Sequence, residues 1–314
     1  MSADDSKSDD DIREAVDRAR SGAPAAGEAV RDRFSTDEIF QRVIASADEE
    51  IDSSVRELFF SGLAAGFAIT LTVLAHAELS ATFSNPQIGA LLYPVGFIYI
   101  IMGRYQLYTE NTLPPVTLVL TRLASIPLLF RVWGVVLFGN LLGAALGALV
   151  LAHANVLTPE AAHAAVEFGR EGIRHGWWSL FFKAIFAGWL VAGMVWLDHA
   201  SRDSAARLLL VYVIIYTIPA TGLYHVVVTA CDASYLLFTG HAGLIPVVVH
   251  FWTPVLLGNT LGGVFLVAVV NYAQTGERHF LSDYRETLSL REWMLGWHAG
   301  RPKVSLREDG SDSE

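Results

Sequence analysis

The feature that most constrains this 314-residue chain is an internal repeat in which each copy contains three apolar spans. Three motifs occur twice, in the same order. They are Leu-Phe-Phe-x4-Ala-Gly from Leu58 and Leu180, Leu-Tyr-Thr/His from Leu107 and Leu223, and Trp-x5-Gly-Asn-x-Leu-Gly from Trp133 and Trp252. An odd number of spans per copy makes the second copy enter the membrane from the opposite side. The pattern predicts an inverted repeat, the architecture of channels and transporters.

Six apolar runs approach or exceed the length of about 20 residues that a helix needs to cross a bilayer. They cover roughly 58–77, 87–105, 133–152, 178–198, 208–236 and 250–272. The chain is 53% apolar with a mean hydropathy of +0.40. The predicted fold class is therefore an all-α membrane protein, with six transmembrane helices arranged as two inverted three-helix repeats.

The charge distribution limits the partners and sets an orientation. The net charge is −10, yet residues 58–273 hold eight acidic and eight basic side chains, so the acidity lies in the tails. Acidic tails argue against nucleic acid as a partner, because that binding needs a basic face. Most basic residues that flank the spans fall on one side if there are six spans. The positive-inside rule then makes both termini cytoplasmic in the cell membrane.

The same reading divides the chain into six parts. Ser35 and Glu38 form a capping-box pattern before an apolar stripe at helical spacing, which predicts an amphipathic helix on the cytoplasmic surface. The predicted parts are an acidic disordered tail 1–34, the amphipathic helix 35–56, the first repeat 57–153, an extracytoplasmic connecting loop 154–177, the second repeat 178–273 and a cytoplasmic tail 274–314.

Two spans are interrupted at corresponding places. The second runs into the polar stretch 104–115, which ends in two prolines, and the fifth contains Pro219, Gly222 and His225. Non-helical backbone at membrane depth is tolerated only where it lines a cavity or is buried in protein. Broken helices in matching positions therefore indicate where a substrate binds.

His225 and Thr109 are the sharpest candidates for contact with a permeant, since they occupy equivalent positions in the two copies. Burial disfavours a charged imidazole, whereas an arriving anion favours it, so His225 can exchange a proton with a weak-acid anion. A buried structural histidine, and a helix-capping role for Thr109, are the alternatives. Glu110 would repel an anion unless paired, and Arg104 is its nearest predicted partner.

Other repeated residues have structural interpretations. Asn140 and Asn259 are expected to hydrogen-bond the backbone of the broken helices, and Gly139 and Gly258 to let helices approach closely. The chain has a single cysteine, Cys231, which excludes a disulfide framework and a cysteine-based metal cluster. No metal site or cofactor is expected. No hydrolase, metalloprotease or phosphate-loop motif stands out, so we do not expect an enzyme.

These residues resemble the formate/nitrite transporter family over about residues 55–275. The final family signature, Pro-Val-x-x-Gly-Asn-x-x-Gly-Gly, is kept in full at 254–263. The signature Gly-Phe-Glu-His-x3-Asn corresponds to 222–229, where Thr229 replaces the asparagine. The first signature corresponds to 104–110, and the second to 187–192, where Gly188 replaces an asparagine. The scaffold looks retained and the polar lining altered, as in a divergent branch.

The resemblance implies a homopentamer of aquaporin-like protomers, each with its own pore for small monovalent anions. It implies that His225 is the central pore histidine and that Thr109 lies on the loop that breaks the second span. It places Tyr93 and Phe97 at a cytoplasmic constriction, and Leu107 and Tyr108, with Ile218 aligned nearby, at a periplasmic one. Further polar residues at the breaks are Arg104, Glu110, Asn111 and Thr229.

The sequence thus predicts a channel or proton-coupled transporter for formate, nitrite or a similar weak-acid anion. Its partners would be the anion, protons, the lipid bilayer and identical subunits. Two alternatives stay open at this point. One is a channel for a neutral or cationic solute such as water, ammonia or a small alcohol, which Glu110 favours. The other is a non-conducting membrane sensor or scaffold.

Overall fold

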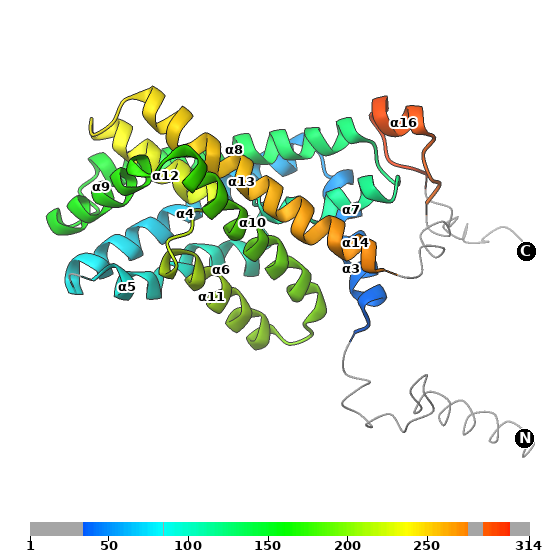
Figure 1. Cartoon of the computed structure of the whole chain (residues 1–314), viewed down its shortest axis with the longest axis horizontal. Helices are drawn as coiled ribbons and strands as arrows, with labels where there is room; N and C mark the ends of the chain where they lie inside the picture. Colours follow the sequence, from blue (N-terminus) through cyan, green and yellow to red (C-terminus); the bar gives the residue numbers. More distant parts are fainter. Residues whose placement is uncertain (1–33, 84, 276–284, 302–314) are drawn as a thin grey trace, which may run out of the picture.

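A computed structural model describes residues 34–83, 85–275 and 285–301, and these ranges contain helices and no strand (Figure 1). Four helices are long and apolar enough to cross a membrane. They are α4 (Val55–Phe83), α8 (Ile126–His153), α10 (Trp177–Ala200) and the continuous run Pro246–Gln274. The chain is therefore a helical membrane protein in architecture, as its sequence predicts.

The fourth long helix is not uniform. It consists of a π-helical turn η3 (Pro246–Trp252), the α-helix α13 (Thr253–Gly263), a second π-helical segment η4 (Val264–Val269) and α14 (Val270–Gln274). The Thr253 hydroxyl donates to the carbonyl of Val248, five residues earlier, which fits the wider π turn.

The long helices pack as two close pairs, α4 on α8 and α10 on α13. Glycines permit this approach. A Cβ on Gly66 would lie 2.1 Å from the carbonyl oxygen of Asn140, and one on Gly188 would lie 2.2 Å from that of Asn259. Small residues at such crossings are the usual means of close packing between helices in lipid.

Shorter apolar helices occupy the space between these pairs. In the first half, α6 (Pro94–Met102) and α7 (Pro114–Leu120) are separated by residues 103–113, which include the 3₁₀ turn η2 (Glu110–Thr112). In the second half, α11 (Ser204–Ala220) and α12 (Val226–Phe238) are separated by residues 221–225. We call residues 103–113 the first break and residues 221–225 the second break.

The molecule has two distinct ends (Figure 1). At the α3 end lie α3 (Thr36–Asp52), α7, α14 and α16 (Leu290–Leu295). At the α9 end lie the short helix α5 (Pro86–Gly89), the 3₁₀ turn η1 (Ala90–Leu92) and α9 (Pro159–Arg174). Segment 154–177, expected to be a loop, is therefore mostly helical. Thr158 caps the start of α9 with its hydroxyl, and Pro159 occupies the first turn.

The helix α3 carries the predicted capping box between Ser35 and Glu38, and its apolar face is buried against α7 and α10. The amphipathic helix was predicted over 35–56, but α3 ends at Asp52, and Val55 begins α4 with an exposed side chain. Of the two predicted tails, residues 1–33, 276–284 and 302–314 lie outside the described residues.

Two arginines, one on α8 and one beyond α14, help to hold α3. The Arg131 guanidinium, on α8, donates to the carbonyl of Ile51 at 2.6 Å, at the C-terminal end of α3. Arg285, near the end of the chain, forms ion pairs with Asp48 at 3.1 Å and Asp52 at 3.0 Å. The α3 end is thus closed by the first and last described segments together.

Candidate permeation site

The two breaks meet at one buried polar pair in the interior. The Thr109 hydroxyl lies 2.8 Å from Nε2 of His225, and both residues are 1% exposed. His225 also caps the start of α12, where its Nδ1 accepts from the Val228 amide at 3.5 Å. Because Nδ1 acts as an acceptor, the neutral imidazole carries its proton on Nε2 and donates it to Thr109. The Thr109 hydroxyl proton then remains available for another acceptor.

Asn140 holds the first break in place. Its side-chain oxygen accepts from the Tyr108 amide at 2.8 Å, and its amide nitrogen donates to the carbonyls of Gly62 at 2.8 Å and Gln106 at 2.9 Å. The side chain is fully buried, so these bonds satisfy backbone groups that the interrupted helix leaves free.

Asn259 does the same for the second break. Its oxygen accepts from the Val226 amide at 2.8 Å, and its nitrogen donates to the carbonyls of Ala184 at 2.8 Å and Tyr224 at 3.0 Å. The prediction that both asparagines bond the broken backbone is confirmed. Gly139 and Gly258 support the same contacts, because a Cβ at either would lie within 3 Å of the carbonyl oxygen of Phe59 or Phe181.

A row of rings runs from His225 toward the α9 end. Phe97 meets His225 edge-on with ring centroids 4.8 Å apart, and Tyr93 stacks on Phe97 at 5.9 Å. Tyr93 in turn meets His76, which stacks on Phe168 of α9 at 4.2 Å. Tyr93 therefore lies at the end opposite α3.

Two of the sequence-based expectations conflict in this geometry. The resemblance placed Tyr93 and Phe97 at the cytoplasmic constriction, yet the predicted cytoplasmic helix α3 is at the other end of the molecule. Tyr93 and Phe97 belong to the α9 side of the central pair. Leu107 and Tyr108, predicted to be periplasmic, precede Thr109 in the first break, which opens toward α3.

The remaining apolar candidates are buried around the pair. Leu107 and Ile218 have no exposed surface. The Tyr108 hydroxyl bonds to Thr260 of α13 at 2.8 Å, and its ring lies edge-on to Trp133 of α8. Tyr108 therefore contacts one helix of each long pair. These contacts hold in place the part of the first break that comes just before Thr109.

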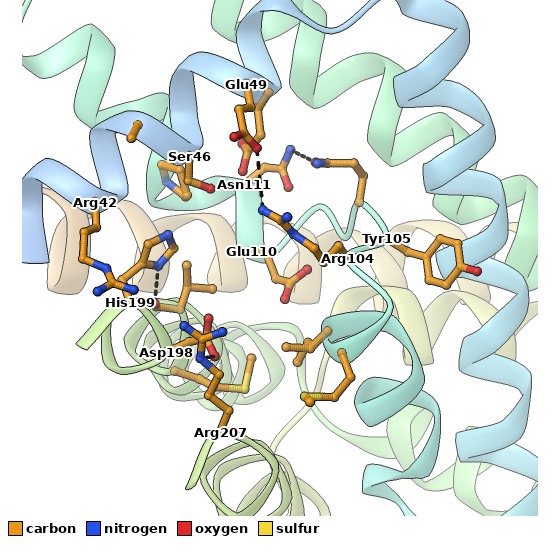
Figure 2. A pocket seen from close by; sticks show the side chains of 18 of the residues that line it. Arg42, Ser46, Glu49, Arg104, Tyr105, Glu110, Asn111, Asp198, His199 and Arg207 are labelled. Carbon is orange, nitrogen blue, oxygen red and sulfur yellow. Dashed lines mark hydrogen bonds and ion pairs between the residues drawn. The ribbon is translucent and has the colours of Figure 1, made fainter. Parts of the chain in front are cut away.

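A chamber of about 730 Å³ opens between α3, the first break and the adjoining ends of α10 and α11 (Figure 2). Its charged lining comprises Arg42, Glu49, Glu50, Arg104, Glu110, Asp198 and Arg207. Burial, and then the neighbouring Glu49 carboxylate, raises the pKa of Glu50 to about 8. One carboxylate oxygen of Glu50 is enclosed without a hydrogen-bond partner.

The predicted ion pair between Arg104 and Glu110 is wrong. Arg104 lies 3.6 Å from Glu49 of α3 instead, in an exposed contact, while Asp198 pairs with Arg207 at 3.4 Å. Arg104 adopts a left-handed backbone conformation with φ of 58°, which turns its side chain away at the end of α6. Among the described residues, no hydrogen bond or ion pair engages the Glu110 carboxylate, which faces the chamber in Figure 2.

Asn111, another polar candidate at the first break, is hydrogen-bonded within the protein. Its side chain donates to Gln106 at 2.8 Å, within the first break, and its carbonyl accepts from the Trp133 indole at 2.8 Å. These bonds fix the loop that carries Thr109. Asn111 therefore acts as a positioning residue in this structure.

Two charged residues near the α9 end were not among the predicted site residues. Asp232 is partly buried two helical turns into α12. Lys183 of α10 donates to the carbonyl of Gly222 at 2.9 Å, and its ammonium lies 5.9 Å from the centre of the Tyr224 ring. Charged side chains in apolar spans are the signal that points to both.

Apolar spanning helices, two interrupted helices clamped by asparagine and a buried polar pair between them define the chain as a membrane channel or transporter. The particular family follows from comparison with known proteins. The sequence profile of the formate/nitrite transporter family matches residues 37–273. The chain belongs to this family.

Individual relatives agree with that assignment. The inner membrane protein YfdC of Escherichia coli is 31% identical over 254 residues, which cover 79% of this chain and 81% of YfdC. The formate channel FocA of Haemophilus influenzae is 23% identical, with 67% and 84% of the two chains covered. A solved pentameric formate channel with formate bound superposes with a TM-score of 0.58 at 19% identity, covering 70% of this chain and 96% of the channel.

Proposed function

We propose that this protein moves a small monovalent weak acid, such as formate or nitrite, across the cell membrane. The observation that carries the proposal is the buried contact between Thr109 and His225, which joins the two breaks. A channel for formate is among both the sequence relatives and the structural neighbours. These relatives support the substrate class, and the central pair supplies groups suited to it.

At the pair, a permeant oxygen would replace the bond between the two side chains. The Nε2–H of His225 and the Thr109 hydroxyl can both donate to a carboxylate or nitrite oxygen. An anion beside the imidazole favours its protonated form, so His225 would exchange a proton with the permeant. Phe97 and Leu107 surround the pair with apolar surface, where a bare charge is costly and the neutral acid crosses more easily.

The wider arrangement follows the same proposal. The four long helices and two broken helices, α6–α7 and α11–α12, would form six crossings as two inverted repeats in an aquaporin-like protomer. Five protomers would assemble, as in the pentameric neighbour. The basic residues that flank the α3 end support a cytoplasmic location for it and for both termini.

A second candidate function is conduction of a neutral or cationic solute such as ammonia. One observation favours it: the Glu110 carboxylate faces the chamber with no cationic partner among the described residues. An ionised carboxylate there would attract a cation and repel an anion. The experiment below separates the two functions.

The test is uptake of labelled formate, with nitrite as a competitor, into proteoliposomes with and without an inward proton gradient. The wild type is compared with His225→Asn, because asparagine keeps the ability to cap α12 but cannot exchange a proton. The matched control is His241→Asn, which alters a histidine in the exposed turn after α12.

We expect gradient-stimulated uptake by the wild type and by His241→Asn, and a loss of about tenfold or more in His225→Asn. Wild-type uptake no greater than in empty vesicles would reject formate and nitrite as substrates. Osmotic swelling and ammonium uptake would then test the second candidate function. Equal uptake by all three proteins would reject the role of His225.

A further inference from the structure

A polar stripe runs along one face of α12 from the central pair toward the α9 end. His225, Thr229 and Asp232 are spaced by four and three residues, the spacing that keeps side chains on one helix face. Thr229 is 1% exposed, and no hydrogen bond among the described residues uses its hydroxyl. Asp232 is partly buried and likewise has no hydrogen bond or ion pair within the described ranges.

An aromatic stripe on α6 faces this polar stripe. Phe97 and Tyr93 are four residues apart, so they also share a face. Phe97 meets His225 at 4.8 Å, and one turn away Tyr93 lies within electrostatic range of Asp232. The two stripes therefore face each other on the α9 side of the central pair, and Asp232 lies nearer the α9 end than His225 does.

Among the residues that the structure describes, no cationic side chain forms an ion pair with Asp232. The titratable groups within its electrostatic range are Tyr93, Tyr224 and Cys231, none of which is cationic. Lys183, the nearest candidate, is directed to the Gly222 carbonyl and the Tyr224 ring. Beyond Tyr224, the next acidic group is Glu171 of α9. An ionised Asp232 would therefore repel an anion at this point.

We infer that Asp232 is the group that gives a proton to a weak-acid anion entering from the α9 end. This inference rests on the proposed function. In the step, the O–H bond of the aspartic acid breaks and an O–H bond forms on the anion, so formate becomes formic acid and Asp232 becomes a carboxylate. Water at the α9 end returns the proton to Asp232. The neutral acid then passes Phe97 and reaches Thr109 and His225.

The distinguishing measurement is the charge moved with each formate. Uptake of labelled formate into proteoliposomes is measured with and without valinomycin and potassium, which dissipate any voltage that builds up. Asp232→Asn keeps the shape of the side chain but cannot supply the proton. Asp232→Ser is a second neutral variant in case the first does not assemble. Asp232→Glu restores a carboxyl group, and Glu171→Gln is the matched control at the same end.

Wild type, Asp232→Glu and Glu171→Gln should take up formate at rates that valinomycin leaves unchanged, because proton and anion enter together. Asp232→Asn and Asp232→Ser should move the bare anion, so their uptake should be slower and should rise severalfold with valinomycin. Valinomycin-insensitive uptake at the wild-type rate in a neutral variant would overturn the inference while leaving the proposed function intact. Absence of uptake by the wild type would reject the proposed function itself.

Discussion

The two breaks share their backbone support but differ in length and in the surroundings onto which they open. Asn140 and Asn259 make the same set of three bonds: each accepts from one backbone amide and donates to one carbonyl at its break, and donates to one carbonyl of a neighbouring long helix. The first break spans residues 103–113 and opens onto a charged chamber, whereas the second spans 221–225 and leads directly into α12. We call each buried asparagine with its three bonds a clamp. Because a clamp bonds only backbone groups, the side chains of the two breaks can differ without any loss of these bonds.

The strongest test of this comparison is to remove each clamp. Asn140→Leu and Asn259→Leu each leave one amide and two carbonyls of the backbone buried without their partners, at about 1–3 kcal/mol per group. We expect both proteins to lose their stable fold, to a similar extent, in thermal unfolding in detergent. Asn271→Leu is the control, because among the described residues that side chain donates to Val267 and accepts from Gln274, both within its own helix. A mild effect at one clamp alone would show that the halves are not equivalent.

The next test concerns the glycines that let the clamps form. Gly66→Ala and Gly188→Ala place a methyl group about 2 Å from the carbonyl oxygens of Asn140 and Asn259, so each should destabilise the protein by about 1–3 kcal/mol. Gly134 and Gly193 lie in α8 and α10 with open space at the Cβ position. Alanine at either should raise stability by about 0.5–1 kcal/mol. Melting temperatures that fall for all four variants would contradict this account.

The third test compares two hydroxyl groups, that of Thr109 in the central pair and that of Thr229 on the α9 side of the pair. Thr109→Val removes the hydroxyl that contacts His225, so formate uptake should fall about tenfold, the equivalent of about 1.4 kcal/mol. Thr229→Val removes a hydroxyl that has no bonded partner among the described residues, and it should reduce uptake less. Uptake by the two variants, normalised to the amount of protein reconstituted, gives the comparison. A larger loss in Thr229→Val would move the main binding position into the α9 side.

The smallest expected effect is a pH dependence confined to the α3 end. Burial, and then Glu49, raises the pKa of Glu50 in the folded protein from 4.5 to about 8. Over that interval the folded chain retains a proton that the unfolded chain has lost, so stability falls as the pH rises from about 4.5 to about 8. Hydrogen exchange of α3, corrected for intrinsic rates, should be slower at pH of about 5.5 than at about 8.5.

Glu50→Gln should abolish most of that difference, because glutamine does not titrate. Glu57→Gln is the control, since Glu57 is exposed at the first turn of α4. An unchanged pH dependence in Glu50→Gln would assign the effect to another group of the chamber.

Sequence patterns predicted two kinds of feature: motifs that occur in both repeats, and polar residues inside apolar spans. The repeated Gly-Asn motif identified both clamps. His225 and its repeat mate Thr109 identified the central pair, because polar residues inside apolar spans are costly and are usually functional. Other features depend on tertiary placement. Arg104 pairs with Glu49 of α3, a partner that distance along the chain cannot indicate.

Some structure was missed although its signal was present. The start of α9 is marked by Thr158 and Pro159, a typical helix cap followed by proline, but the polar composition of the segment favoured a loop. The two π-helical segments η3 and η4 leave no pattern that distinguishes them from an ordinary apolar helix. The importance of Asp232 follows from its phase relative to His225, which requires the start of α12 to be known.

The contacts that hold α3 also limit when this helix can become fixed during synthesis of the chain. This helix leaves the ribosome before the long apolar helices, whereas Arg285, which pairs with Asp48 and Asp52, follows the last of them. The α3 side of the chamber therefore cannot reach its final form until translation has passed the last long helix. A ribosome that stalls between Gln274 and Arg285 would leave a protein that has its four long helices but lacks the ion pairs that hold α3.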